Sequence, residues 1–320
     1  MSSTSSTTPA RPDDPEAPPP GGVREAQTIA TLRAGDAVDA VFACVRKERQ
    51  MARSGTPYLT VELRDQSGSV TGRVFRDADL LAGRFERGDL VQVRGRAELF
   101  REQLQLTVEQ IARVELSDED AMRFLPVSRR DVDELEGFFE HLAREVYDPG
   151  LKELLRRLLG DRELRAELRR APCSLPSSGP ARSFVHHAFL GGLLEHTVAV
   201  ATLAVELCAV HPRLDRDLLL CAALVHDLGK TREYAYGAEI VRTEEGRMLG
   251  HVELGLRVIA SHAPPTLPAE RRMALEHCVL CHHGADSGPQ RFASAEALAL
   301  QRLNALDAGV KGAFEQGIGR

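Results

Sequence analysis

The histidines of this 320-residue chain are concentrated in one region. Of the 11 histidines, all but His141 lie between residues 186 and 283. Several fall inside apolar runs, where a single histidine is usually a packing residue. A set this large within one segment, with several members deep in apolar runs, instead favours imidazoles that bind a metal.

Two aspartates accompany these histidines within runs that resemble buried helices. His196 lies in GGLLEHTVAVATL, His226 and Asp227 end LLLCAALVHDLGK, and Asp307 lies on an apolar stripe near the C-terminus. A buried carboxylate is costly without a cation, and no Lys or Arg inside these helices is an obvious partner for both aspartates. A divalent metal held by His196, His226, Asp227 and Asp307 would satisfy all of these groups.

Lys230 stands one turn beyond His226 and has two interpretations. Its ammonium could offer charge to a phosphate at the metal site. It could equally be a solvated charge close to the end of a helix. The residues alone leave both interpretations open.

Helices must position these residues, because the chain after residue 186 has helical periodicity. The runs with helical length and spacing are 187–210, 216–228, 250–262, 268–283 and 294–314. They predict an all-α domain over residues 183–314, followed by a short tail at 315–320. A charged, leucine-rich segment within 117–182 predicts a helical linker before this domain.

Residues 27–116 have a different pattern, with apolar residues alternating along five short segments. Strict alternation indicates half-buried strands, and five of them predict a small β-barrel. A helix at 78–86, between the third and fourth strands, would give the OB-fold arrangement. Residues 1–26 are rich in Ser, Thr and Pro and predict a disordered tail. The predicted fold class is a multidomain α+β protein, with an N-terminal five-stranded OB-fold β-barrel followed by the all-α domain.

Composition excludes several classes of protein. A net charge of −6 and a pI near 6.0 argue against coating nucleic acid by charge alone. The 6 cysteines have no spacing typical of a disulfide framework. We find no signal peptide and expect no stretch that approaches a membrane span of about 18 apolar residues. These observations predict a soluble cytoplasmic protein with no membrane partner.

The motifs, taken in order, resemble those of YhaM-type 3′–5′ exoribonucleases of the HD superfamily. The core pattern H…HD…D corresponds to His196, His226-Asp227 and Asp307, and HHAFLGGLLEHT, RDLLLCAALVHDLGK and CHHG are similar as well. GTPYLTVELRDQSGSVTGRVF resembles the OB-fold domain of the same proteins. The resemblance covers residues from about 27 to 312. The chain departs from the family at Cys281, where Ser is common, and at Phe75, where Trp is common.

The resemblance implies two metal ions in the HD domain. Its implied ligands are His196, His226, Asp227, His251, His282, His283 and Asp307. Asp227 would bridge the ions, and Asp227, Lys230 and His251 would be the catalytic group. Two ions lower the pKa of a water and stabilise the attacking and leaving oxygens of a phosphodiester. A mixed imidazole and carboxylate site favours Mn²⁺, with Co²⁺, Fe²⁺, Mg²⁺ and Zn²⁺ as alternatives.

The resemblance also implies that the barrel binds nucleic acid. The basic candidates, expected in the loop between the first two strands, are Arg46, Lys47, Arg49 and Arg53. Tyr58, Phe75 and Phe100 are candidates for stacking on bases. The alternative is that the aromatic rings fill the barrel and the basic run is a solvated loop.

The implied function is a 3′–5′ exoribonuclease that hydrolyses single-stranded RNA, with DNA as an alternative, to nucleoside 5′-monophosphates. One alternative is an HD phosphohydrolase of free or cyclic nucleotides. The loop after His283 reads GADSGPQ and lacks the Gly-Tyr-Pro of relatives that cleave cyclic di-GMP. Another alternative is a non-catalytic single-strand-binding protein. The sequence leaves the metal, the preference for RNA or DNA, and a homo-oligomeric state open.

Overall fold

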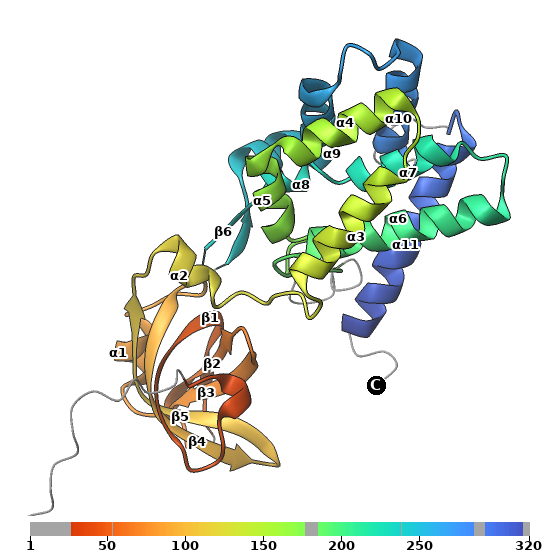
Figure 1. The fold of residues 1–320 in the computed structure, drawn as a ribbon. Helices are drawn as coiled ribbons and strands as arrows, with labels where there is room; N and C mark the ends of the chain where they lie inside the picture. The colour runs from red at the N-terminus through yellow and green to blue at the C-terminus, as the bar shows by residue number, and fades with distance from the viewer. Residues whose placement is uncertain (1–26, 53, 177–184, 238, 285–291, 316–320) are drawn as a thin grey trace, which may run out of the picture.

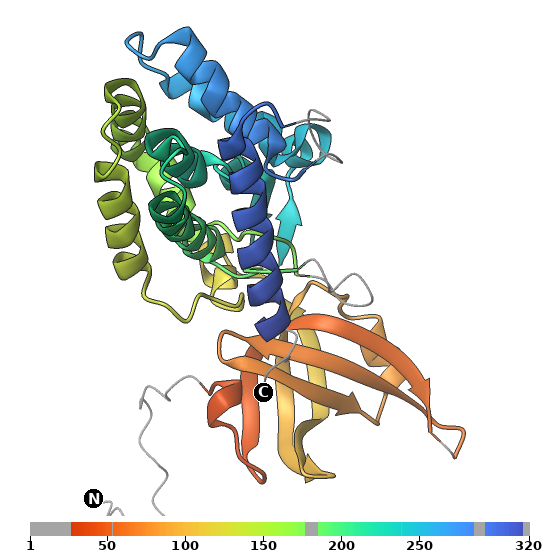
Figure 2. The same ribbon diagram turned by 90° about the vertical axis from the view of Figure 1, so that its right-hand side faces the viewer.

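The computed structural model describes residues 27–52, 54–176, 185–237, 239–284 and 292–315. A β-barrel and a helical body form two separate masses, and the barrel lies below the helical body in both views (Figures 1 and 2). The predicted tail at 1–26 lies outside the described residues, as do Arg53, the loop at 177–184 and residues 316–320. Glu315, the first residue of the predicted tail at 315–320, instead ends the last helix.

The barrel is closed by five strands in the order β1-β2-β3-β5-β4. These strands are β1 (Ala37–Met51), β2 (Pro57–Asp65), β3 (Gly68–Val74), β4 (Leu90–Phe100) and β5 (Gln103–Val114). Alternate residues of β2 point inward, so that Leu59, Val61 and Leu63 are each at most 1% exposed. A 3₁₀ turn (η1, Ile29–Thr31) precedes the barrel, and α1 (Ala78–Ala82) lies between β3 and β4. The five strands and the helix confirm the predicted OB-type barrel.

β1 is longer than the sequence suggested, and this corrects the position of the basic run. Arg46, Lys47 and Arg49 lie within β1 rather than in the loop that follows it. Their backbones pair with β2, where Lys47 is opposite Val61 and Arg49 is opposite Leu59. Long basic side chains fit a strand because their methylene stems lie along apolar neighbours while the charge reaches outward, as it does in Arg46 and Arg49, or finds partners, as it does in Lys47. A run of basic residues was therefore not sufficient evidence for a loop at this position.

The helical body has one continuous apolar core. Its helices are α3 (Val132–Arg144), α4 (Pro149–Gly160), α5 (Arg162–Arg170), α6 (Gly192–Val210), α7 (Arg216–Val225), α8 (Lys230–Glu233), α9 (Glu244–His262), α10 (Ala269–Cys281) and α11 (Ala295–Glu315). The short α2 (Asp118–Met122) connects the barrel to this body. Leu135 of α3 and Leu151 of α4 are fully buried in the same core as α6 and α7. The segment expected to be a linker thus supplies part of the core.

The prediction that the helical domain is all-α is wrong at one place. Two short antiparallel strands, β6 (Tyr234–Tyr236) and β7 (Ile240–Arg242), form a hairpin between α8 and α9. Three residues are too few for a period of two to be recognised. Tyr234 and Ile240 pack on Leu125, which lies in the connector, the segment 115–131 between β5 and α3. Glu239 Oε1 lies 4.0 Å from Arg87 Nε of the barrel.

α6 is apolar enough to resemble a membrane span. Its mean hydropathy over an 18-residue window is 1.7, so the expectation that no stretch approaches a span was wrong on composition. In the structure 56% of that window is buried. α6 packs against α3, α7 and α11 and carries the fully buried His196, so here it is a core helix of the helical body.

Candidate metal centre

The HD pair lies where α7 ends and the chain turns into α8. His226 caps the C-terminus of α7, and Asp227 follows it. Gly229 allows the turn to lie against α9, because a Cβ there would come within 1.9 Å of the His251 carbonyl oxygen. This close approach brings the His226-Asp227 pair beside His251, a residue 24 positions later in the sequence.

A first set of ligand atoms comes from α6 and the end of α7. His196 Nε2 lies 3.3 Å from His226 Nε2 and 3.7 Å from Asp227 Oδ2. His226 Nε2 lies 3.3 Å from the same carboxylate oxygen. All three residues are at most 1% exposed. The ligand atoms of the three residues lie within 4.8 Å of one another.

A second set uses the other oxygen of the same aspartate. Asp227 Oδ1 lies 3.5 Å from His251 Nε2 and 3.4 Å from His282 Nε2. His251 Nε2 is 2.8 Å from His283 Nε2. Asp227, His251, His282 and His283 again offer ligand atoms within 4.8 Å of one another. Asp227 therefore presents one oxygen to each set of imidazoles.

Backbone carbonyls fix the orientation of two of the imidazoles. His226 Nδ1 donates to the Ala223 oxygen at 2.9 Å, and His282 Nδ1 donates to the Val279 oxygen at 2.5 Å. A carbonyl only accepts, so in the neutral ring the proton is on Nδ1 and the lone pair is on Nε2. Both Nε2 atoms therefore have a lone pair available for a metal ion.

The buried polar atoms of the site fit a divalent cation. Asp227 Oδ1 and His282 Nε2 are buried and have no hydrogen-bond partner among the described residues. Burial lowers the pKa of His282 to about 4, which keeps the ring neutral. Burial opposes ionisation of Asp227, but the charge of the Lys230 ammonium outweighs it and holds the pKa of Asp227 well below the usual range. Neutral imidazoles and an ionised carboxylate are the forms that bind metals.

Asp307 lies at the opposite side of the His196 ring. Its Oδ2 is 2.6 Å from His196 Nδ1, whereas the first set meets the ring at Nε2. Asp307 forms a separate close group with His187 and His196. The structure brings Asp307 to the site as predicted, but as a neighbour of His196 and outside both sets that share Asp227.

Lys230 is buried, which excludes a solvated charge. It is 5% exposed, and its Nζ donates to Asp227 Oδ2 at 2.7 Å and to Cys173 Sγ at 3.3 Å. Burial disfavours the charged form, but the Asp227 carboxylate outweighs it and raises the pKa of Lys230. Lys230 is therefore an ammonium held directly against the shared aspartate.

Two further residues at the site were not predicted from the sequence. Glu233, which is 2% exposed, places Oε2 3.2 Å from His251 Nδ1. Cys173, which is 1% exposed, lies 3.8 Å from Asp227 Oδ2. Neither residue belongs to a periodic pattern, and each depends on folding of distant segments. No signal in the sequence alone could have indicated these contacts.

The basic candidates of the barrel are paired within the barrel. Arg46 donates to Glu48 at 2.8 Å, and Arg49 donates to Asp79 at 2.6 Å. Lys47 is directed at the end of α1, where its Nζ donates to the carbonyl oxygens of Ala82 at 2.8 Å and Phe85 at 2.7 Å. These contacts give Lys47 a structural role at the C-terminal end of the helix.

The aromatic candidates form an exposed surface. The rings of Tyr58 and Phe75 stack with centroids 5.6 Å apart, and Phe75 is 48% exposed. The guanidinium of Arg73 lies 5.0 Å from the ring of Phe100, which is 43% exposed. Since Phe75 and Phe100 both face solvent, the alternative that the aromatic rings fill the barrel is wrong for these two residues.

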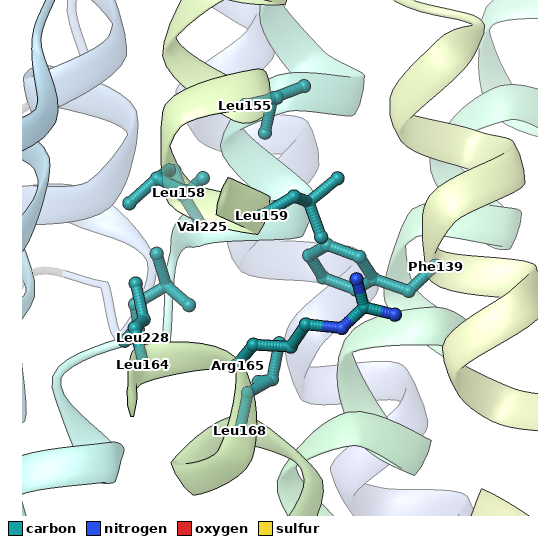
Figure 3. Close-up of a pocket in the computed structure, with 9 residues that line it drawn as sticks. All are labelled: Phe139, Leu155, Leu158, Leu159, Leu164, Arg165, Leu168, Val225 and Leu228. Atoms are coloured by element: carbon teal, nitrogen blue, oxygen red, sulfur yellow. The ribbon is translucent and has the colours of Figure 1, made fainter. Parts of the chain in front are cut away.

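A pocket elsewhere in the helical body carries no such chemistry. Leucines from α4 and α5 line it, together with Phe139 and Val225, as Figure 3 shows. Arg165 is its one charged lining residue, and it is paired with Glu136 and Glu140. We interpret this pocket as a gap in the apolar core.

Comparisons with known proteins agree with the two parts of the structure. Residues 193–309 match the HD domain family, and residues 41–114 match the OB-fold nucleic acid binding domain family. The chain is 28% identical over 291 residues to the 3′-5′ exoribonuclease YhaM of Shouchella clausii (strain KSM-K16). That similarity covers 88% of this chain and 87% of the relative.

Two solved structures are also similar to this chain. One is the second OB-fold domain of replication protein A from Methanococcus maripaludis, at 20% identity and a TM-score of 0.24, covering 29% of this chain and 98% of that one. The other is a replication protein A heterotrimer bound to single-stranded DNA, at 15% identity and a TM-score of 0.23, covering 31% and 73%. Scores this low carry no argument about function.

Proposed function

We propose that this chain, a homologue of the YhaM exoribonuclease, is a metal-dependent 3′–5′ exoribonuclease. The premise is that it joins an OB-fold nucleic acid binding domain to an HD domain. Its substrate would be single-stranded RNA, and its products nucleoside 5′-monophosphates. The observation that carries the proposal is the buried Asp227 carboxylate, which offers one oxygen to each of two histidine sets.

Two divalent cations fit these sets. His196, His226 and Asp227 would hold one ion, and Asp227, His251, His282 and His283 would hold the other. Such ions lower the pKa of a water and stabilise negative charge on the attacking and leaving oxygens of a phosphodiester. We favour Mn²⁺, because imidazole and carboxylate together suit it.

The two sets differ in their exposure, and this suggests how substrate reaches them. His196 and His226 are fully buried, whereas His283 is exposed and His251 is partly so. A nucleic acid strand would therefore approach from the side of His251 and His283. The buried first set would be shielded from bulk water, which strengthens electrostatic interactions there.

Lys230 supports the charge of the site in two ways. Its ammonium holds Asp227 ionised through the 2.7 Å contact with Oδ2. An ammonium has three donors, and the contacts with Asp227 and Cys173 use two of them. We propose that the third is offered to a phosphate oxygen of the substrate.

We assign base stacking in the barrel to Tyr58 and Phe75. Stacking on aromatic rings tolerates any base and suits an enzyme that removes nucleotides in succession. Arg46 and Arg49 are less suitable, because Glu48 and Asp79 already hold their guanidiniums. A cytoplasmic location, activity on DNA and a homo-oligomeric state stay predictions.

The test is hydrolysis of a labelled single-stranded RNA by protein stripped of metal and then supplied with Mn²⁺. We expect activity only after the ion is added, and an Asp227→Ala protein should bind little Mn²⁺ and stay inactive. Asp133→Asn is the matched control, since the Asp133 side chain is 82% exposed on α3. Full activity and metal content in the Asp227→Ala protein would contradict the proposal.

A further inference from the structure

Glu233 is a buried carboxylate for which the chemistry proposed above has no use. It ends α8 and stands between the HD pair and the β6–β7 hairpin. Its Oε1 lies 3.3 Å from Arg242 Nε, and its Oε2 lies 3.2 Å from His251 Nδ1. Oε2 has no partner in full hydrogen-bond geometry among the described residues, and its contact with His251 Nδ1 is an ion-pair distance.

His251 differs from the other histidines of the site in how its ring is held. His226 and His282 each donate Nδ1–H to a carbonyl three residues earlier in their own helix. His251 instead follows Gly250, where α9 is interrupted by a non-helical residue with φ 72° and ψ 160°. Its Nδ1 contacts the Glu233 carboxylate and not a carbonyl of its own helix.

We propose that Glu233 is a positioning residue that directs His251 toward the second metal ion. A carboxylate that accepts from Nδ1–H leaves the lone pair on Nε2 and makes that nitrogen more basic. His251 Nε2 lies 2.8 Å from His283 Nε2 and 3.5 Å from Asp227 Oδ1, within the second set. The inference rests on the proposed two-ion site and deepens it.

The surroundings of Glu233 are rigid enough for this role. Its carbonyl oxygen accepts from the Thr243 N–H at 3.0 Å. A Cβ at Gly246 would lie 2.3 Å from the same oxygen, so α9 begins in direct contact with the Glu233 backbone. The hairpin returns Arg242 beside the carboxylate, whose two oxygens are thus divided between a guanidinium and an imidazole.

The experiment is a Mn²⁺ titration of metal-free full-length protein, with bound ions counted by equilibrium dialysis. We expect two ions in the wild type. In Glu233→Gln the second ion should bind about 10 to 100 times more weakly, as is typical when a supporting carboxylate is lost. Glu245→Gln is the matched control, because the Glu245 side chain is 38% exposed and pairs with Arg232 at 3.0 Å, away from His251. Unchanged affinity in Glu233→Gln overturns the inference and leaves the proposed function standing.

A double-mutant cycle distinguishes a role of Glu233 through His251 from a purely structural role. If Glu233 acts through His251, then adding Glu233→Gln to a His251→Asn protein should cause no further loss of Mn²⁺ affinity. An equal further loss would overturn the inference. Should Glu233→Gln fail to fold, Glu233→Asp keeps the charge on a shorter side chain. It should bind the second ion more weakly than the wild type does, but by less than the 10- to 100-fold expected for Glu233→Gln. A wild type that binds no Mn²⁺ would instead contradict the two-ion site itself.

Discussion

Asp227 is the residue on which both sets of ligand atoms depend. Its carboxylate is 1% exposed, and the Lys230 ammonium holds its pKa well below the usual range. Because His226 precedes it at the end of α7, consecutive residues supply an imidazole and a carboxylate to one point. The sequence predicted this pair and His196 correctly as neighbours, since each interrupts an apolar run where it would otherwise be costly.

Asp307 provides a prediction at the same scale. From its contact with His196 Nδ1 we propose that Asp307 orients this ring and does not bind the ion itself. Asparagine keeps an oxygen that can accept the Nδ1–H. We therefore expect Asp307→Asn to keep two Mn²⁺ ions with affinity reduced about 10- to 100-fold, measured by equilibrium dialysis. Loss of a whole ion would instead place Asp307 among the ligands, as the sequence suggested.

At the scale of elements, the helices that carry the site were predictable and their junctions were not. α6, α7, α10 and α11 have apolar periodicity that sets their approximate bounds. The β6–β7 hairpin and the kink at Gly250 are too short for any period to be recognised. These junctions decide where Glu233 and His251 lie, which explains why the sequence did not predict their contact.

Gly250 is the element-scale feature that can be tested directly. Its φ of 72° and ψ of 160° fall in a region that is essentially restricted to glycine. We expect Gly250→Ala to lower the free energy of unfolding by about 1–3 kcal/mol, or to turn His251 away and weaken Mn²⁺ binding.

The matched control for this change is Gly137→Ala in the exposed interior of α3. Alanine there meets no atom within 4 Å and should raise the free energy of unfolding by about 0.5–1 kcal/mol. Urea denaturation of metal-free protein measures both variants. A Gly250→Ala protein with wild-type stability and wild-type Mn²⁺ affinity would show that the kink is not required.

At the scale of the whole molecule, the barrel and the helical body are linked by the connector and the β6–β7 hairpin. Leu125, Tyr234 and Ile240 form a small apolar cluster at this junction. The order of the two parts was predictable from the change of period along the sequence. Their contact was not, because it depends on single residues such as Glu239, which lies 4.0 Å from Arg87.

If the barrel binds RNA and the helical body hydrolyses it, substitutions in the barrel should affect RNA binding but not hydrolysis of a small substrate. Replacing Tyr58 and Phe75 with Ala should weaken binding to long single-stranded RNA about tenfold or more, because base stacking contributes about 1–3 kcal/mol per base. Hydrolysis of bis-p-nitrophenyl phosphate, which is too small to reach the barrel, should be unchanged. Fluorescence anisotropy and a colorimetric assay measure the two quantities.

Phe138→Ala is the control for these substitutions, since Phe138 is 44% exposed on α3 and lies outside the barrel. It should leave RNA binding as in the wild type. An equal fall of binding and small-substrate hydrolysis in the Tyr58 and Phe75 variant would mean that the barrel is structural. Unchanged RNA binding would place the contact with bases elsewhere.

The most direct test of the proposed function is the identity of the first products released from a single-stranded RNA labelled at its 5′ end. With Mn²⁺ present, we expect a ladder of progressively shorter labelled strands, with nucleoside 5′-monophosphates present in the chromatogram from the first turnover. This follows because attack on phosphorus with the 3′ oxygen of the shortened strand as leaving group keeps the phosphate on the released nucleotide. Nucleoside 3′-monophosphates, 2′,3′-cyclic phosphates or internal fragments as the first products would contradict the proposed function.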